Sequence, residues 1–186
     1  DDKSDEEIDE KTRTERAMDN LVFRMASNPA LQPYSEHAMG VKGRKIRVLW
    51  DSASTVVAIM TEDNFARISA EFPEKFRQVE MYDVPEDLDG VDERDGGASL
   101  TGHVQMQLEL CAGRHKWVQV SIMKGGSTGS AHLLLGNRLM KKDRWNGAVD
   151  MGKNVIKLRN FGDGQGRLKI PIQWKVCGDS FEKETA

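Results

Sequence analysis

Hydrophobic and polar positions along this chain predict a domain built from many short β-strands. Residues 103–110 alternate, with Val104, Met106 and Leu108 separated by polar residues, as expected for a strand with one buried face. A glycine-containing turn follows, and residues 116–123 alternate in the same way. Other segments with strand-like patterns are 45–50, 55–60, 76–83, 131–136, 145–150, 155–158 and 168–176. Many short strands joined by glycine turns are typical of an all-β fold, either a barrel or a sandwich.

Helical patterns are few and short. Apolar residues spaced three and four apart, after a capping-box sequence at Thr12–Glu15, predict an amphipathic helix at about residues 13–27. Side chains that commonly cap helices precede a second helical stretch at 65–68, and residues 138–143 suit one or two turns. Because an isolated helix of this length is only marginally stable in water, we expect the first helix to pack on its own domain or on a partner.

The pattern divides the chain into a tail, a domain and a second tail. Residues 1–40 begin with seven acidic residues among the first ten, which predicts disorder before the helix. Prolines and glycines make residues 28–42 a predicted linker. One β domain then fills 41–178, with a long polar, glycine-rich loop at 85–102. The polar residues 179–186 are predicted to fray.

Composition removes several classes of function. The chain has 186 residues, a net charge of -3 and a pI of about 5.9, so we expect no bulk attraction to nucleic acid or to an anionic membrane. No apolar run approaches the roughly 20 residues of a membrane span, and we expect an intracellular, cytoplasmic protein. Neither the two cysteines nor the four histidines have metal-ligand spacing, so we predict no metal site and no cofactor. The histidines are His37, His103, His115 and His132, and we interpret them as structural or surface residues.

Candidate chemistry lies at the end of the first strong strand of the domain. Residues 46–59 read as a hydrophobic strand, then Asp51, then small residues including Ser52 and Ser54, then a second hydrophobic strand. A carboxylate between apolar walls is suited to a shifted pKa and to acid–base catalysis. The alternative interpretation is an ordinary hairpin turn that Asp51 caps, because aspartate and serine are common turn residues.

The order of motifs along the chain resembles that of the retropepsins, the aspartic proteases of retroviruses and of long-terminal-repeat retrotransposons. Residues 49–54, Leu-Trp-Asp-Ser-Ala-Ser, are similar to the strand–Asp–Ser/Thr–Gly motif of that family, and residues 87–102 occupy the place of its flap. The apolar Leu-Leu-Gly of 134–136, followed by a Leu-Met-Lys segment within 137–142, resembles its second motif. A strand carrying an aspartate follows at 148–150.

This resemblance implies a retropepsin-like closed β-barrel half with one short helix, working as a homodimer. The chain holds a single motif of this type, so two copies would place an Asp51 pair on a twofold axis. The implied activity is endopeptidase cleavage of a polyprotein, by a water activated between the two carboxylates. Ser52 would hydrogen-bond across the dimer, and the backbone of Ala53 with Gly96 and Gly97 of the flap would bind the peptide main chain.

Two departures from the family pattern keep other functions open. Ala53 stands where the family has glycine, and Trp50 is larger than the usual aliphatic residue before the aspartate. The resemblance implies that this position lies against bound peptide, so the methyl group of Ala53 would crowd a substrate there. The second hypothesis is therefore an inactive retropepsin-like domain that serves as a dimerisation or protein-binding module, since a fold alone does not establish an activity. The third is an all-β adaptor unrelated to proteases.

Overall fold

The computed structural model describes residues 31–40, 44–52, 54–88 and 98–176. The predicted helix at about 13–27, the acidic start of the chain and the tail at 179–186 lie outside the described residues. The described part is predominantly β, as the alternating pattern predicted.

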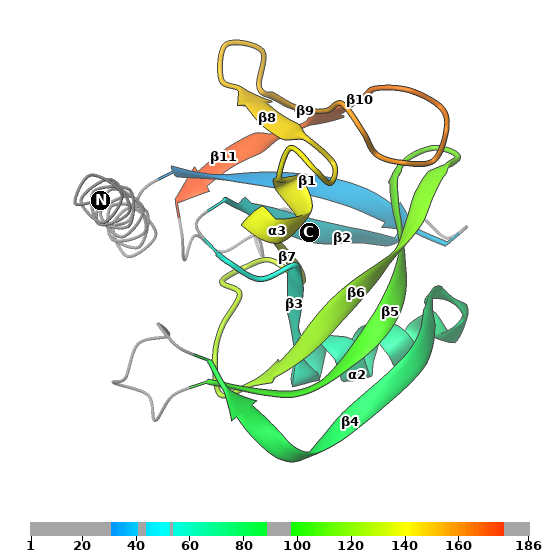
Figure 1. The fold of residues 1–186 in the computed structure, drawn as a ribbon, viewed down its shortest axis with the longest axis vertical. Helices are drawn as coiled ribbons and strands as arrows, with labels where there is room; N and C mark the ends of the chain where they lie inside the picture. The colour runs from blue at the N-terminus through cyan, green and yellow to red at the C-terminus, as the bar shows by residue number, and fades with distance from the viewer. Residues whose placement is uncertain (1–30, 41–43, 53, 89–97, 177–186) are drawn as a thin grey trace, which may run out of the picture.

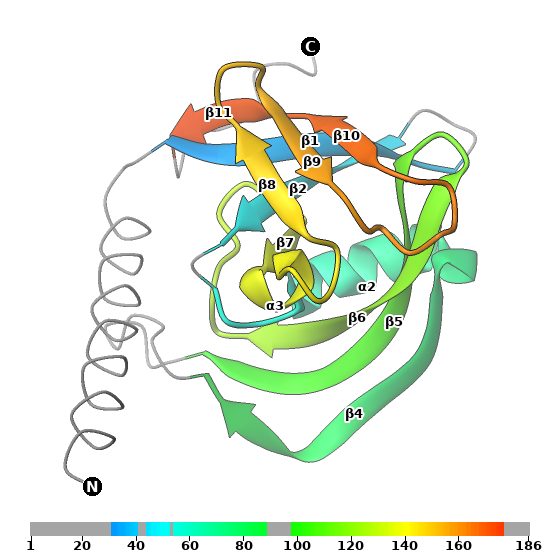
Figure 2. The same cartoon turned by 45° about the horizontal axis from the view of Figure 1, so that its top comes forward.

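Eight strands form one mixed sheet, and three more form a second sheet (Figure 1). In spatial order the large sheet contains β11 (Gln173–Val176), β1 (Leu31–Met39), β2 (Arg44–Asp51), β7 (Leu133–Gly136), β3 (Ala58–Thr61), β6 (Arg114–Lys124), β5 (Ser99–Cys111) and β4 (Phe76–Asp87). The small sheet contains β10 (Leu168–Pro171), β9 (Val155–Leu158) and β8 (Gly147–Asp150). Figures 1 and 2 both show the small sheet at the β1–β11 end of the molecule and the β4–β5 hairpin at the opposite end.

The large sheet is open, so the expectation of a closed barrel is wrong for the described residues. Its hydrogen-bonded order begins at β11 and ends at β4, and these two edge strands do not pair with each other. Strand β4 is exposed along nearly its whole length and has two register irregularities against β5. Acidic side chains and Pro85 on such a strand are typical of an edge that does not close onto another strand.

The hydrophobic core is formed by side chains from both sheets, and the burial along β5 confirms the predicted alternation of buried and polar residues. Val104, Met106 and Leu108 of β5 are buried, while the residues between them are only partly buried. Aromatic rings fill the region under the small sheet, where Trp145 lies 6.3 Å from Trp50 and 5.1 Å from Phe161 between ring centroids. These contacts join the two sheets into one core.

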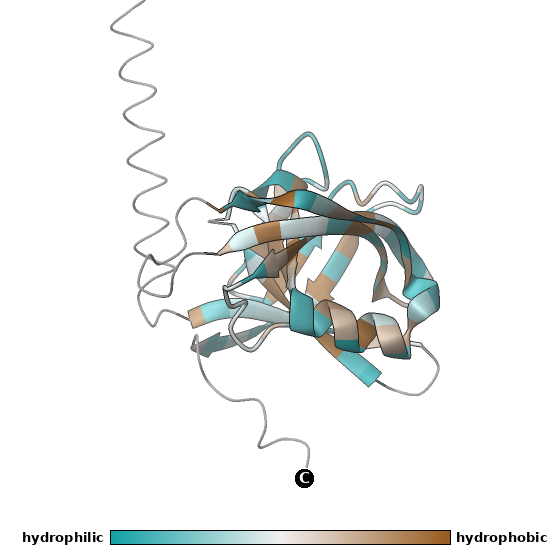
Figure 3. Ribbon diagram, turned by 90° about the horizontal axis from the view of Figure 1, so that it is seen from below, coloured by the Kyte–Doolittle hydropathy of each residue, from teal (hydrophilic) through white to brown (hydrophobic). Residues whose placement is uncertain are grey.

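Two α-helices are present in the described chain, where the resemblance implied one. Helix α2 (Glu62–Glu71) extends the predicted stretch at 65–68, and a 3-10 turn, η1 (Pro73–Lys75), follows it. Thr61 caps α2 by accepting a hydrogen bond from the Asn64 backbone N–H at 3.2 Å. Helix α2 carries both hydrophilic and hydrophobic residues (Figure 3), and Ile68 is buried against the core. Helix α3 (Asn137–Met140) is one turn long. No helix in the ranges given above has the length and apolar character needed to cross a membrane.

The prediction of a linker at residues 28–42 is wrong for residues 31–39. These residues form β1, which pairs with β2 on one side and with β11 on the other. Pro33 argued against a strand in the sequence. In the structure Pro33 lies near one end of β1, opposite Trp174 of β11. Buried Tyr34, Ser35 and His37 anchor β1 in the sheet. The predicted loop at 85–102 is shorter than expected, because its two ends belong to β4 and β5.

Candidate functional site

The structure brings the two motifs at 49–54 and 134–136 side by side. Strand β2 runs parallel to β7, with Trp50 opposite Leu135 and Asp51 opposite Gly136. Strand β7 also pairs with β3 in the antiparallel direction, so it lies between the two strands that the Asp51 turn connects. Two segments that are far apart in the sequence therefore end at one point, with a carboxylate at that point.

Backbone hydrogen bonds hold the turn after Asp51 over the end of β7. The Ser54 N–H donates to the Asp51 carbonyl at 3.2 Å, which closes the turn itself. The Gly136 N–H donates to the Val57 carbonyl at 2.9 Å, and the Asn137 N–H donates to the Ser54 carbonyl at 2.7 Å. The turn is thus held in place by the backbone N–H groups of Gly136 and of the residue after it. This excludes the simple two-stranded hairpin, because β2 and β3 are separated by β7.

Gly136 has no space for a side chain. A Cβ atom there would lie 2.0 Å from the Val56 carbonyl oxygen and 3.0 Å from the Ser54 carbonyl oxygen. Both oxygens belong to the fixed backbone of the turn, so neither is free to move aside. A glycine at the end of β7 is what allows the Asp51 turn to approach so closely.

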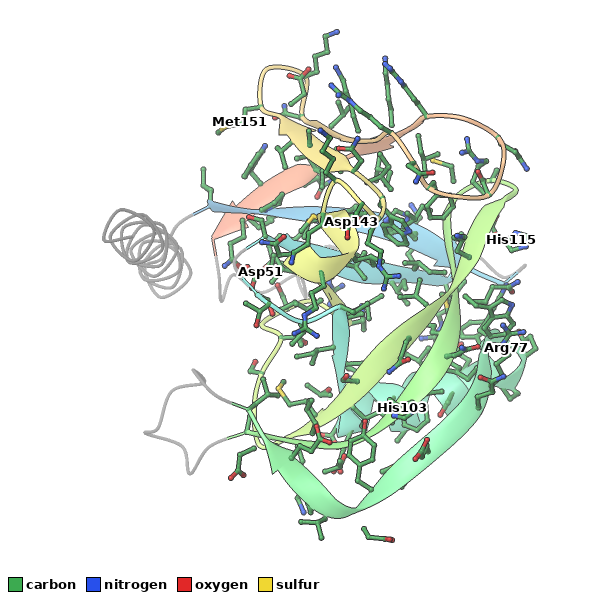
Figure 4. All side chains as sticks on the ribbon, viewed as in Figure 1. Asp51, Arg77, His103, His115, Asp143 and Met151 are labelled. Atoms are coloured by element: carbon green, nitrogen blue, oxygen red, sulfur yellow. The ribbon has the colours of Figure 1, made fainter. Side chains whose placement is uncertain are left out.

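The predicted site residues are only partly described. Asp51 is half-buried where β2 ends (Figure 4), Ser52 is exposed and Ser54 is half-buried. Ala53, Gly96 and Gly97 lie outside the described residues. The structure therefore places Asp51 and Ser54 beside the second motif and leaves the predicted role of the flap untested.

A buried polar network lies beneath the residue that precedes Asp51, and the sequence did not indicate it. The Trp50 indole N–H donates to Ser35 Oγ at 2.7 Å, and Ser35 Oγ lies 2.6 Å from His37 Nε2. His37 Nδ1 lies 3.0 Å from the carbonyl oxygen of Leu110. Because a carbonyl oxygen only accepts, Nδ1 carries the hydrogen, and the Ser35 hydroxyl donates to Nε2. Every polar atom of this network has a partner, so Trp50 is tied to Ser35 on β1 and, through His37, to Leu110 on β5.

Burial keeps His37 neutral. Only 4% of this residue is exposed, and desolvation lowers its pKa from 6.5 to about 4, while the hydrogen bond to Leu110 opposes the shift. A protonated ring would need a second acceptor at Nε2, where the Ser35 hydroxyl is also engaged by the Trp50 N–H. The network therefore supports the fold in the state in which His37 is neutral, which is the state favoured at neutral pH.

The remaining histidines lie apart from one another. His132 Nδ1 accepts the Arg47 backbone N–H at 2.9 Å, and burial lowers its pKa to about 4. His103, on the β4–β5 hairpin, lies 2.8 Å from the Tyr82 hydroxyl and 3.2 Å from a Glu80 carboxylate oxygen. Across the residues that the structure describes, no three His, Cys, Asp or Glu side chains gather where they could hold a metal ion.

A cavity of about 370 Å³ lies elsewhere, between β6 and the segment that follows α3. It is lined by Val57, Lys116, Trp117, Val118, Gln119, Leu139, Asp143, Arg144, Trp145, Asn160, Phe161 and Gly162. Asp51 does not line this cavity, although Val57, which accepts the hydrogen bond from Gly136, does.

Comparisons of this chain with known protein families, with curated proteins and with solved structures find no match. The class of site is consequently defined by its own geometry: a half-buried carboxylate at a strand end, held by a glycine-dependent crossing of two backbone segments.

Proposed function

We propose that this protein is a retropepsin-type aspartic endopeptidase that acts as a homodimer. The observation that carries the proposal is the parallel register of Asp51 with Gly136, because it joins in space the two motifs on which the sequence resemblance depends. Here the carboxylate is held at a fixed place by two backbone hydrogen bonds from β7 and α3.

The proposed fold is a retropepsin-like half that becomes a complete site only in the dimer. Its support is the placement of β7 between β2 and β3, the two strands joined by the turn that carries Asp51. The open large sheet does not conflict with this arrangement, since the open edges belong to β4 and β11 and not to the strands around Asp51.

The proposed mechanism uses one Asp51 from each chain. Two carboxylates in close contact do not both ionise, so the pair holds one proton and titrates as a unit. The ionised member takes a proton from a water molecule, whose oxygen attacks the peptide carbonyl carbon. The protonated member gives its proton to the carbonyl oxygen. The Asp51 that took the water proton then gives it to the peptide nitrogen, and the C–N bond breaks to release the amine. The other Asp51 takes a proton from a hydroxyl of the intermediate as the carboxylic acid forms, which restores the singly protonated pair without a covalent enzyme intermediate.

The proposed substrate is an extended peptide within a polyprotein, such as that of a retrotransposon. Ser52 is exposed beside Asp51, which suits the proposed hydrogen bond to the second chain. Ala53 is the residue that favours the second candidate, a domain that dimerises and binds protein without cleavage, because the family has glycine there.

The experiment that separates these functions is cleavage of a peptide library by the wild type, Asp51→Asn and Asp63→Asn. Asp63 is an exposed aspartate on α2, so its substitution makes the same charge change away from the site. We expect cleavage by the wild type and by Asp63→Asn at mildly acidic pH, and none by Asp51→Asn. Light scattering on each sample reports the dimer. Cleavage that survives Asp51→Asn overturns the mechanism, whereas an intact dimer that never cleaves supports the binding module.

A further inference from the structure

One long edge of β6 borders the 370 Å³ cavity instead of another strand. Strand β3 pairs with β6 only at residues 121–123, although β6 begins at Arg114. Before β3 begins, the chain turns away to cross over Gly136. The first half of β6 is therefore paired on its β5 side and lacks a strand neighbour on the other side within the described chain.

The residues that line the cavity on its β6 side show that the edge of this strand faces it. Lys116, Trp117, Val118 and Gln119 are four consecutive residues, and all four line the cavity. Side chains of consecutive strand residues point to opposite faces of a sheet, so one face contributes only every second residue. Four in a row border the same space only where the edge of the strand faces it. In a paired strand about half of the backbone N–H and C=O groups point to each side, so this edge presents hydrogen-bonding groups to the cavity.

The cavity has an apolar base opposite the β6 edge, and two basic side chains border it. Buried Trp145 and Phe161, with Leu139 of α3, form the base. Arg144, which follows α3, is exposed, and Lys116, on the β6 edge itself, is partly buried. Neither cation has a carboxylate within ion-pairing distance among the described residues. Asp143 is the one acidic residue of the lining, and the exposed Lys141 and Lys142 precede it in the chain.

We propose that this cavity is a docking site for an extended acidic peptide segment of a partner protein, which adds as a strand to the open edge of β6. The unpaired backbone edge selects a peptide over a small anion, because only a peptide supplies a matching row of N–H and C=O groups. Lys116 and Arg144, which pair with no carboxylate among the described residues, select acidic side chains. A strand with alternating residues places apolar side chains on the Trp145–Phe161 base and acids beside these two cations. This site does not depend on the proposed proteolysis at Asp51.

The test uses the full chain and two fluorescein-labelled heptapeptides, Glu-Val-Glu-Leu-Glu-Val-Glu and the same peptide with lysine in place of every glutamate. Fluorescence anisotropy gives the affinities. We expect the acidic peptide to bind at least about tenfold more tightly than the basic one, as charge complementarity requires. Arg144→Glu should weaken binding of the acidic peptide by about tenfold. Lys124→Glu is the matched control, since Lys124 is exposed on the same strand but outside the cavity, and it should change the affinity by less than about twofold.

A second measurement tests strand addition itself. An acidic heptapeptide with N-methyl groups on alternate residues keeps its charge and loses the N–H groups of one edge. A second peptide carries the N-methyl groups on the other set of alternate residues, so it lacks the N–H groups of the opposite edge. One of the two methylated peptides should lose binding, and the unmodified peptide should shift the backbone amide resonances of Lys116–Gln119. The proposal is overturned if both methylated peptides bind like the parent, if Lys124→Glu weakens binding as much as Arg144→Glu does, or if the acidic peptide shows no saturable binding.

Discussion

The turn around Asp51 and the strand β4 are opposite extremes of this molecule. At the Asp51 turn, two backbone segments cross so closely that only a glycine fits at position 136. Strand β4 pairs on one side, with irregular register, and exposes large apolar residues such as Val79, Met81 and Val84. The first region is held by backbone contacts on two sides, whereas β4 pairs with β5 alone and leaves most of its side chains exposed. A substitution should therefore be costly in the first region and almost neutral in the second, although both are built from β-strand sequence.

The largest expected effect comes from Gly136→Ala. Its methyl group would meet the Val56 carbonyl oxygen at 2.0 Å, so the turn must move or the strand must unpair. We expect a loss of at least about 4 kcal/mol in the free energy of unfolding, measured by urea denaturation. The control is Gly113→Ala, where the backbone has a φ of +74 but no atom lies within 4 Å, and the expected cost is only about 1 to 2 kcal/mol. Equal losses in the two variants would show that the close crossing is not what constrains Gly136.

Acidification should destabilise the region beneath Asp51. The unfolded state takes up a proton on His37 near pH 6.5 and the folded state only near pH 4, so between these values the unfolded state binds more protons. Stability from this residue is present above about pH 6.5 and falls as the pH drops towards 4, by about 3 kcal/mol in total. His132 acts in the same direction.

Urea denaturation of the wild type and of His37→Gln between pH 7 and pH 4 measures this effect, because the variant has no ring to titrate. The stability of the wild type should fall more steeply with decreasing pH than that of His37→Gln. Parallel curves for the two proteins would mean that His37 has an ordinary pKa in the folded state.

A smaller loss is expected for Ser35→Ala. The substitution leaves the Trp50 indole N–H and His37 Nε2 without their shared partner in a buried place. The expected cost is about 2 kcal/mol of unfolding free energy. Ser69→Ala on α2 removes the same hydroxyl from a partly exposed site and should change stability by less than about 0.5 kcal/mol. If Ser35→Ala is as mild as Ser69→Ala, the network does not support Trp50.

The smallest effect belongs to the exposed edge. Val84 is 77% exposed on β4, and Val84→Thr should leave the free energy of unfolding within about 0.5 kcal/mol of the wild type. The same substitution at the fully buried Val104 of β5 places a hydroxyl in the core and should cost about 2 kcal/mol. A large loss at Val84 would reveal a contact of β4 in the assembled protein, and it would break the contrast drawn above.

The local pattern of the sequence predicted most of the strands and helices, but it did not predict which of them lie in contact. Alternation predicted β5 and β6 within a few residues, because each has one buried face and one polar face. The short apolar run at β7 was also identified. Strand β1 was missed, because Pro33 and the neighbouring glycines resemble a linker and its buried residues include polar Ser35 and His37.

Two glycines show the same limit of prediction from local sequence. In the sequence Gly136 was one letter of a motif, and Gly102 was assigned to a loop. In the structure a Cβ at Gly102 would lie 2.4 Å from the Glu80 carbonyl oxygen, so both glycines are places where two backbone segments approach closely. Close approach depends on a segment far away in the chain, which no local pattern contains. For the same reason, the edge of β6 at the cavity became visible only once the shortness of β3 was known.

The most direct test of the central claim, a shared proton between two Asp51 side chains, is carboxyl-carbon NMR on protein labelled with carbon-13 at aspartate. The Asp51 resonance is assigned by its loss in Asp51→Asn, and the oligomeric state is followed in the same samples. A dimer whose Asp51 signal titrates in two separate steps is the predicted result. A monomer at all concentrations, or a single step like that of an exposed aspartate, would contradict it.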